Sequence, residues 1–126
     1  MILDFTGFPM VWMNVGTAGI DTDDEGFKAF EVLLAGGEPF VLLDAERAEQ
    51  AAPSQEEQKE LALWMKRHKA ALRSVVKAQV HIEPDLGKRQ AASAFAAKFE
   101  LFWGYPLFVV SGREEGLSLA RRLMAQ

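Results

Sequence analysis

The chain has 126 residues, of which 49% are hydrophobic and 25% charged, which fits one compact domain and excludes the disordered class. Its 18 acidic residues outnumber its 14 lysines and arginines, and the net charge of -4 argues against a general nucleic-acid binder. The absence of cysteine excludes disulfides, thiolate metal sites and a cysteine nucleophile.

The first residues carry an acid instead of the basic start of a signal peptide, and no apolar run approaches the length of about 20 residues that a membrane-spanning helix needs. We therefore expect no integral membrane segment and a cytoplasmic location.

Four short apolar runs, rich in β-branched and aromatic side chains, predict strands. They cover residues 10–15, 39–43, 78–82 and 106–110. The last three are almost continuously apolar, which is typical of strands covered by helices on both faces, so a parallel sheet is favoured. Residues 2–5, which precede a Gly-Phe-Pro turn signal, could add an edge strand.

Four segments with helical spacing follow these runs. Three of them open with a capping box of Ser or Thr and a Glu three residues later, namely Thr22 and Glu25, Ser54 and Glu57, and Ser111 and Glu114. The first helix buries Phe27, Phe30 and Leu34 and ends at the Gly36-Gly37 pair. The second is predicted as one amphipathic helix whose apolar stripe runs from residue 61 to residue 76.

The third helix begins near Pro84-Asp85 and must stop by Gly104. Its core stripe is predicted to comprise Ala91, Phe95, Phe99 and Phe102. The last helix buries Leu117, Ala120, Leu123 and Met124. The pattern predicts a single α/β domain over residues 1–126, with four βα units, right-handed crossovers and a mainly parallel sheet of four to five strands flanked by helices.

Several of these segments, taken in order over residues 10–124, resemble the SpoIIAA-like, STAS/SEC14-type branch of the STAS superfamily. Residues 38–45 resemble its second strand, which closes on an Asp, here Asp44, and residues 53–68 resemble its acid-capped helix. Residues 77–82 resemble the third strand, and residues 105–116 the last strand and helix cap.

This resemblance implies a protein-interaction or small-ligand module whose contact surface surrounds the third strand and its helix. In the anti-sigma factor antagonists of the superfamily, a phosphorylatable Ser lies at the start of the helix after the third strand. The corresponding residues here, 83–88, have no hydroxyl side chain, and none follows before Ser93, so the chain departs from that motif.

Ligands of open α/β sheets usually bind at the carboxyl ends of the strands. That edge is expected to gather Asp21, Asp44, Arg47, Glu83, Asp85, Lys88, Arg89, Ser111 and Arg113. The carboxylates could bind Mg²⁺ or share protons. The alternative, which we favour, is that Asp21 and Asp85 cap helices and the other charges are solvated.

A small anionic ligand could bind the helix start at Gly87, Lys88 and Arg89, where free amides and two cations coincide, with Asp44, Asp85 and Arg113 as further candidate ligand-binding residues. No glycine-rich phosphate loop accompanies them, so ordinary helix-start charges are the favoured interpretation.

The two histidines, His68 and His81, lack the spacing of a metal site. His68 lies on an apolar stripe and is expected to be a hydrogen-bonded residue at the core boundary, whereas His81 could face either side of its strand. No nucleophile elbow or catalytic triad is present in the sequence, so we predict no catalytic residue, metal or cofactor.

The end of the third helix is richer in aromatic residues than one core-facing stripe requires. One interpretation is a core wrapped around the helix end. The others are a homodimer or partner interface, and a pocket for an apolar ligand or a contact with a membrane surface. The candidate interface residues are Phe99, Leu101, Phe102, Trp103 and Tyr105, of which Leu101, Trp103 and Tyr105 are expected to point partly away from the core.

The sequence thus leads us to expect a non-enzymatic, STAS-like interaction or regulatory module that self-associates as a homodimer. The alternative is a carrier or sensor for a small apolar or anionic ligand, such as a lipid or a nucleotide.

Overall fold

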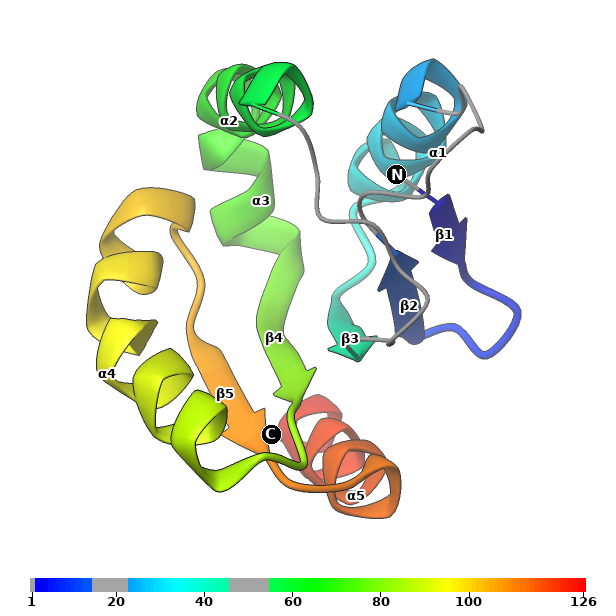
Figure 1. Ribbon diagram of the computed structural model, residues 1–126. Helices are drawn as coiled ribbons and strands as arrows, with labels where there is room; N and C mark the ends of the chain where they lie inside the picture. The colour runs from blue at the N-terminus through cyan, green and yellow to red at the C-terminus, as the bar shows by residue number, and fades with distance from the viewer. Residues whose placement is uncertain (1, 15–22, 46–54) are drawn as a thin grey trace.

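The computed structural model describes residues 2–14, 23–45 and 55–126 (Figure 1). In chain order the elements are β1 (Ile2–Asp4), β2 (Met10–Asn14), α1 (Asp23–Gly36), β3 (Phe40–Ala45), α2 (Gln55–Arg67), α3 (Lys69–Val75), β4 (Val76–Ile82), α4 (Leu86–Trp103), β5 (Leu107–Val110) and α5 (Arg113–Met124).

The five strands form one mixed sheet in the order β1-β2-β3-β4-β5. Strands β2 to β5 are parallel, and β1 pairs antiparallel with β2 at one edge. The prediction of an α/β fold with a mainly parallel sheet is therefore confirmed. Because consecutive strands are neighbours, right-handed crossovers place every connecting helix on the same face.

Two apolar clusters lie on the two faces of the sheet. The larger one joins residues of α1, α2, α3 and α4 to the strands, and the smaller one joins α5 to the opposite face. Figure 1 shows α5 on the opposite side of the sheet from α1 and α2. In β3, Phe40 and Leu42 belong to the first cluster and Val41 and Leu43 to the second, and all four are buried. This two-sided burial explains the continuous apolar run.

The predicted second helix is wrong as a single element. The chain leaves helical geometry at His68, whose φ is -104° and ψ is 13°, and a separate helix α3 follows. The strand β4 then begins at Val76, a position that the prediction placed in the helix, and Val76 pairs with Phe40 of β3. A helix that packs on the core and a strand inside the core can both show a run of apolar residues. The spacing of residues alone therefore did not distinguish the end of the helix from the start of the strand.

Left-handed glycines end two of the helices as predicted. Gly37 follows α1 with a φ of 72°, and Gly104 caps α4 with a φ of 91°. The predicted capping box of Ser111 and Glu114 is wrong by one residue: Gly112 is the N-cap of α5, and both the amide and the hydroxyl of Ser111 donate to Glu115. The boxes that begin at Thr22 and Ser54 start outside the described residues.

The core stripe predicted for α4 needs a correction. Phe99 is buried as expected, but Phe95 and Phe102 are 51% and 54% exposed. Tyr105, which was expected to point partly away from the core, is only 1% exposed, because the chain turns back at Gly104 and directs the ring against Phe99. The single-domain organisation that the sequence favours stays a prediction.

Candidate functional site

Polar side chains form a connected cluster inside the face that α1 to α4 cover. The Asp44 carboxylate, on β3, binds Nδ1 of His81, on β4. Its other oxygen accepts a hydrogen bond of 2.6 Å from Nε2 of Gln79. The hydroxyl of Tyr105 donates to Oε1 of Gln79 at 3.3 Å, which extends the cluster to the segment that enters β5. We call Asp44, Gln79, His81 and Tyr105 the polar cluster.

Asp44 and His81 lie toward the carboxyl ends of β3 and β4, where they are partners in the register, whereas Gln79 lies in the middle of β4 and Tyr105 just before β5. Gln79 and Tyr105 are buried, and the side chains of Asp44 and His81 retain about a fifth of their exposure. Burial raises the pKa of the Tyr105 hydroxyl well above its ordinary value, and the negative charge of Asp44 raises it further. Tyr105 therefore stays a neutral hydrogen-bond donor.

The hydrogen-bonding groups of the cluster are largely satisfied within it. Both oxygens of Asp44 and both ends of the Gln79 amide have partners inside the cluster. Such an arrangement stabilises one register between neighbouring strands, because a slip would leave buried polar atoms without partners. Asp44 was a predicted ligand-binding residue, but its place in this cluster was not predicted from the sequence.

Four of the predicted anion-binding residues, Asp85, Gly87, Lys88 and Arg89, lie at the start of α4. The Asp85 carboxylate accepts a 2.8 Å hydrogen bond from the amide of Lys88, so it caps the helix as the favoured interpretation expected. Arg89 donates to the carbonyls of Glu83 and Pro84, both at 3.2 Å. Any anion at Gly87 would therefore share the helix start with the Asp85 carboxylate, whose Oδ2 lies 3.4 Å from the position a Gly87 Cβ would take.

The structure does not bring Asp44 and Arg113 together. Asp44 contacts Gln79 on the face covered by α1 to α4, whereas the Arg113 guanidinium lies 4.1 Å from the ring centre of Trp12, which packs on the α5 side. Asp21 and Arg47 lie outside the described residues. Among the residues that are described, no three His, Asp or Glu side chains are grouped as a metal site would require.

His68 is a boundary residue, as expected from its position on the stripe. Its Nε2 lies 3.4 Å from Oε1 of Glu31, and its ring packs on Trp64 with centroids 4.5 Å apart. The Trp64 indole donates to the same Glu31 oxygen at 3.0 Å. These contacts join α1 to α2 and explain why a polar side chain lies on an apolar stripe.

The outer surface of α4 is unusually apolar. Eight large hydrophobic side chains are exposed in the described part of the chain, and α4 carries four of them: Leu86, Phe95, Leu101 and Phe102. Leu101 is 77% exposed and Trp103 is half-buried. Of the five predicted interface residues, Phe99 and Tyr105 are buried within the chain, whereas Leu101 and Phe102 are on the surface.

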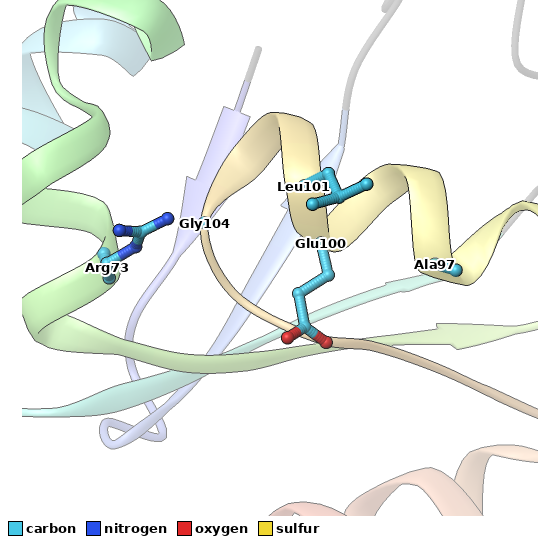
Figure 2. A pocket seen from close by; sticks show the side chains of 5 residues that line it. All are labelled: Arg73, Ala97, Glu100, Leu101 and Gly104. Atoms are coloured by element: carbon cyan, nitrogen blue, oxygen red, sulfur yellow. The ribbon is translucent and has the colours of Figure 1, made fainter.

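A shallow recess separates α4 from α3 (Figure 2). Its lining is Arg73, Ala97, Glu100, Leu101 and Gly104, and its volume is about 660 Å³. Figure 2 shows the Arg73 side chain on one wall, opposite the last turn of α4. Lys69 reaches across the same boundary and donates to the Leu101 carbonyl at 3.0 Å.

No helix in the described segments combines the length and the apolar character that crossing a membrane requires. Comparison with known proteins gave no match to a family model, to a curated protein or to a solved structure.

Proposed function

We propose that the chain is a non-enzymatic, STAS-like interaction module of the cytoplasm that binds other proteins, including its own copies, through the outer surface of α4. The observation that carries the proposal is the exposure of Phe95, Leu101 and Phe102 on one helix. Contiguous exposed apolar surface is characteristic of association sites, and aromatic side chains are enriched in them.

The energetic argument follows from the half-exposed rings. Complete burial of a Phe side chain contributes about 1.5–3 kcal/mol, so covering the exposed half of Phe95 and Phe102 would add roughly half of that amount for each ring. Leu101, the most exposed of the three, would add a similar term. In a symmetric pair each contribution counts twice, which can offset much of the entropic cost of association.

Two further observations support the proposal. The polar cluster uses both Asp44 oxygens internally, which favours a structural role for these residues over a catalytic one. The exposed surface lies on the helix that follows β4, the region that the STAS-like resemblance implied as the contact surface.

The test is the molar mass in solution, measured by size-exclusion chromatography with light scattering up to high micromolar concentration. We expect a dimer for the natural chain and a weaker one for Phe102→Ser. Val32→Ser is the matched control, because Val32 is 71% exposed on α1 and its loss should leave the mass unchanged. A natural chain that stays monomeric throughout and behaves like Phe102→Ser would contradict self-association.

A further inference from the structure

Among the described residues, the strand β5 forms an open edge of the sheet. It pairs with β4 and ends the strand order. On the β4 side, the carbonyls of Pro106 and Val110 accept hydrogen bonds of 2.9 and 2.8 Å from the amides of Gln79 and Glu83. Backbone groups of successive strand residues point to opposite sides, so Leu107 and Val109 direct their N–H and C=O groups to the open side.

The sequence of this edge favours pairing with another strand. Its four residues are Leu107, Phe108, Val109 and Val110, with no charge and no proline to block an incoming strand. Natural proteins commonly protect an edge with such residues, and an apolar edge that lacks them is a template for strand addition.

The open groups of β5 are complementary to those of a second β5 that runs antiparallel. With a two-fold axis at Phe108, Leu107 of one copy faces Val109 of the other. In an antiparallel ladder, two such residues exchange both of their N–H to O=C hydrogen bonds. Phe108 would then face Phe108 of the second copy as a pair without hydrogen bonds, in which the Cβ atoms are about 4.5–5.5 Å apart.

Two opposite charges on α5, Glu115 and Arg122, are placed so that they would meet across the same two-fold axis. Arg113 packs on Trp12 of β2, so that flank of α5 faces away from β5. Helical spacing places Glu115, Leu119 and Arg122 on the other flank, toward β5. In an antiparallel pair of copies, Glu115 of each would approach Arg122 of the other, while the partly buried Leu119 lies between them near the axis.

The exposed aromatic side chains of α4 lie on the flank of the helix that faces away from α3. Lys69 contacts the Leu101 carbonyl, and Arg73 borders Gly104, so this flank of α4 faces α3. Phe95 and Phe102 are seven residues apart, about two helical turns, and lie on the opposite flank. Figure 1 shows α4 and β5 side by side at the same margin of the molecule. The apolar flank of α4 and the open edge therefore form one surface.

From these relationships we infer that the partner is a second copy of this chain, joined by antiparallel pairing of the two β5 strands about an axis at Phe108. The result is one continuous sheet of two molecules, with Phe95 of each copy packed toward Phe102 of the other. The inference rests on the proposed self-association and adds its geometry.

The first test is disulfide cross-linking between introduced cysteines, which is specific because the chain has no cysteine of its own. Phe108→Cys places one thiol next to its symmetry mate, and mild oxidation should convert most of the protein to a covalent dimer. Val32→Cys, at an exposed position on α1, the helix between β2 and β3, is the control and should cross-link little. Equal cross-linking of the two variants, at the same protein concentration and with native circular dichroism, would overturn the geometry.

The second test changes the edge without changing the β4 ladder. Val109→Pro removes an N–H that points to the open side, so the monomer should remain folded while the dimer dissociation constant rises at least about tenfold. Arg122→Glu should weaken the dimer by like-charge contact with Glu115 of the second copy, and Glu115→Arg combined with Arg122→Glu should restore it.

The outcomes separate the inference from the proposed function. If the natural chain is monomeric, both the proposed self-association and the inferred pairing through β5 are contradicted. A dimer that Phe102→Ser weakens, but that Val109→Pro and Arg122→Glu leave unchanged, keeps the interaction module and overturns pairing through β5. Weakening by Val109→Pro, with rescue of Arg122→Glu in the double variant, supports the inferred geometry.

Discussion

Asp44 and His81 are direct partners in the register of β3 and β4, and the carboxylate of one binds Nδ1 of the other. The pair therefore adds a side-chain link to the backbone ladder at the centre of the sheet. Gln79, two residues before His81, donates a hydrogen bond to the second carboxylate oxygen of Asp44. Its own side-chain oxygen accepts a hydrogen bond from the Tyr105 hydroxyl. Through Gln79, this carboxylate thus links β3 and β4 to the segment that enters β5.

Replacement of Asp44 by alanine is expected to lower the free energy of unfolding by about 1–3 kcal/mol, because the Gln79 amide and the His81 ring each lose a partner in a partly buried setting. Urea denaturation followed by circular dichroism measures the loss. Glu60→Gln, at an exposed position on α2, is the matched control and should change stability little. Equal stability of Asp44→Ala and the natural chain would contradict a structural role for the cluster.

Tyr105 gives the protein an alkaline limit that can be observed directly. Burial and the Asp44 charge raise the pKa of its hydroxyl in the folded state above the value of about 10 that it has in the unfolded chain. The unfolded state therefore loses this proton first. The stabilising contribution is complete below about pH 10 and decreases as the pH rises beyond that value.

Because Tyr105 is the one tyrosine of the chain, tyrosinate absorbance reports on this group alone. We expect the absorbance change to coincide with unfolding as the pH is raised. Tyr105→Phe should reduce the alkaline loss of stability and lower stability near neutral pH by about 0.5–1.5 kcal/mol through the lost hydrogen bond. Titration of Tyr105 with an ordinary pKa in a chain that is still folded would contradict its burial.

Much of the fold was predictable, because the strands β3, β4 and β5 carry strong local signals. Phe40 to Leu43 are apolar without interruption and are buried on both faces of the sheet, as the pattern predicted. Gly104 follows an aromatic helix end and adopts the left-handed conformation that only glycine adopts readily. Local chemistry determined these features.

Other features depend on tertiary contacts that the spacing of residues does not contain. Phe95 and Phe99 are one helical turn apart and look equivalent in sequence, but α4 contacts the sheet through Phe99 and leaves Phe95 largely exposed. The boundary between α3 and β4 at Val76 depends on pairing with Phe40, which is distant in the chain. The polar cluster was not predicted for the same reason. Gln79 and Tyr105 belong to no recognisable sequence motif, and they come close to Asp44 only in the folded sheet.

Gly104→Ala is expected to destabilise the protein by about 1–2 kcal/mol, because a φ of 91° is unfavourable for an L residue. The added Cβ would also lie 3.4 Å from Cβ of Arg73, at the recess between α3 and α4. Gly36→Ala is the control: this residue ends α1 without a positive φ, and no neighbouring atom lies within 4 Å of the new Cβ. It should be neutral or stabilising, and thermal unfolding that ranks the two variants in the opposite order would contradict the assignment.

The last prediction concerns the start of α4, where Asp85 caps the helix and two cations follow. Asp85→Ala removes the acceptor of the Lys88 amide and should cost about 0.5–2 kcal/mol in urea denaturation. Asp85→Asn keeps a capping oxygen and should retain most of the stability, which separates the hydrogen bond from the charge. If both variants lose stability equally, the charge on the helix dipole is the larger contribution. If Asp85→Ala is as stable as the natural chain, the hydrogen bond to Lys88 contributes nothing to the stability of the fold.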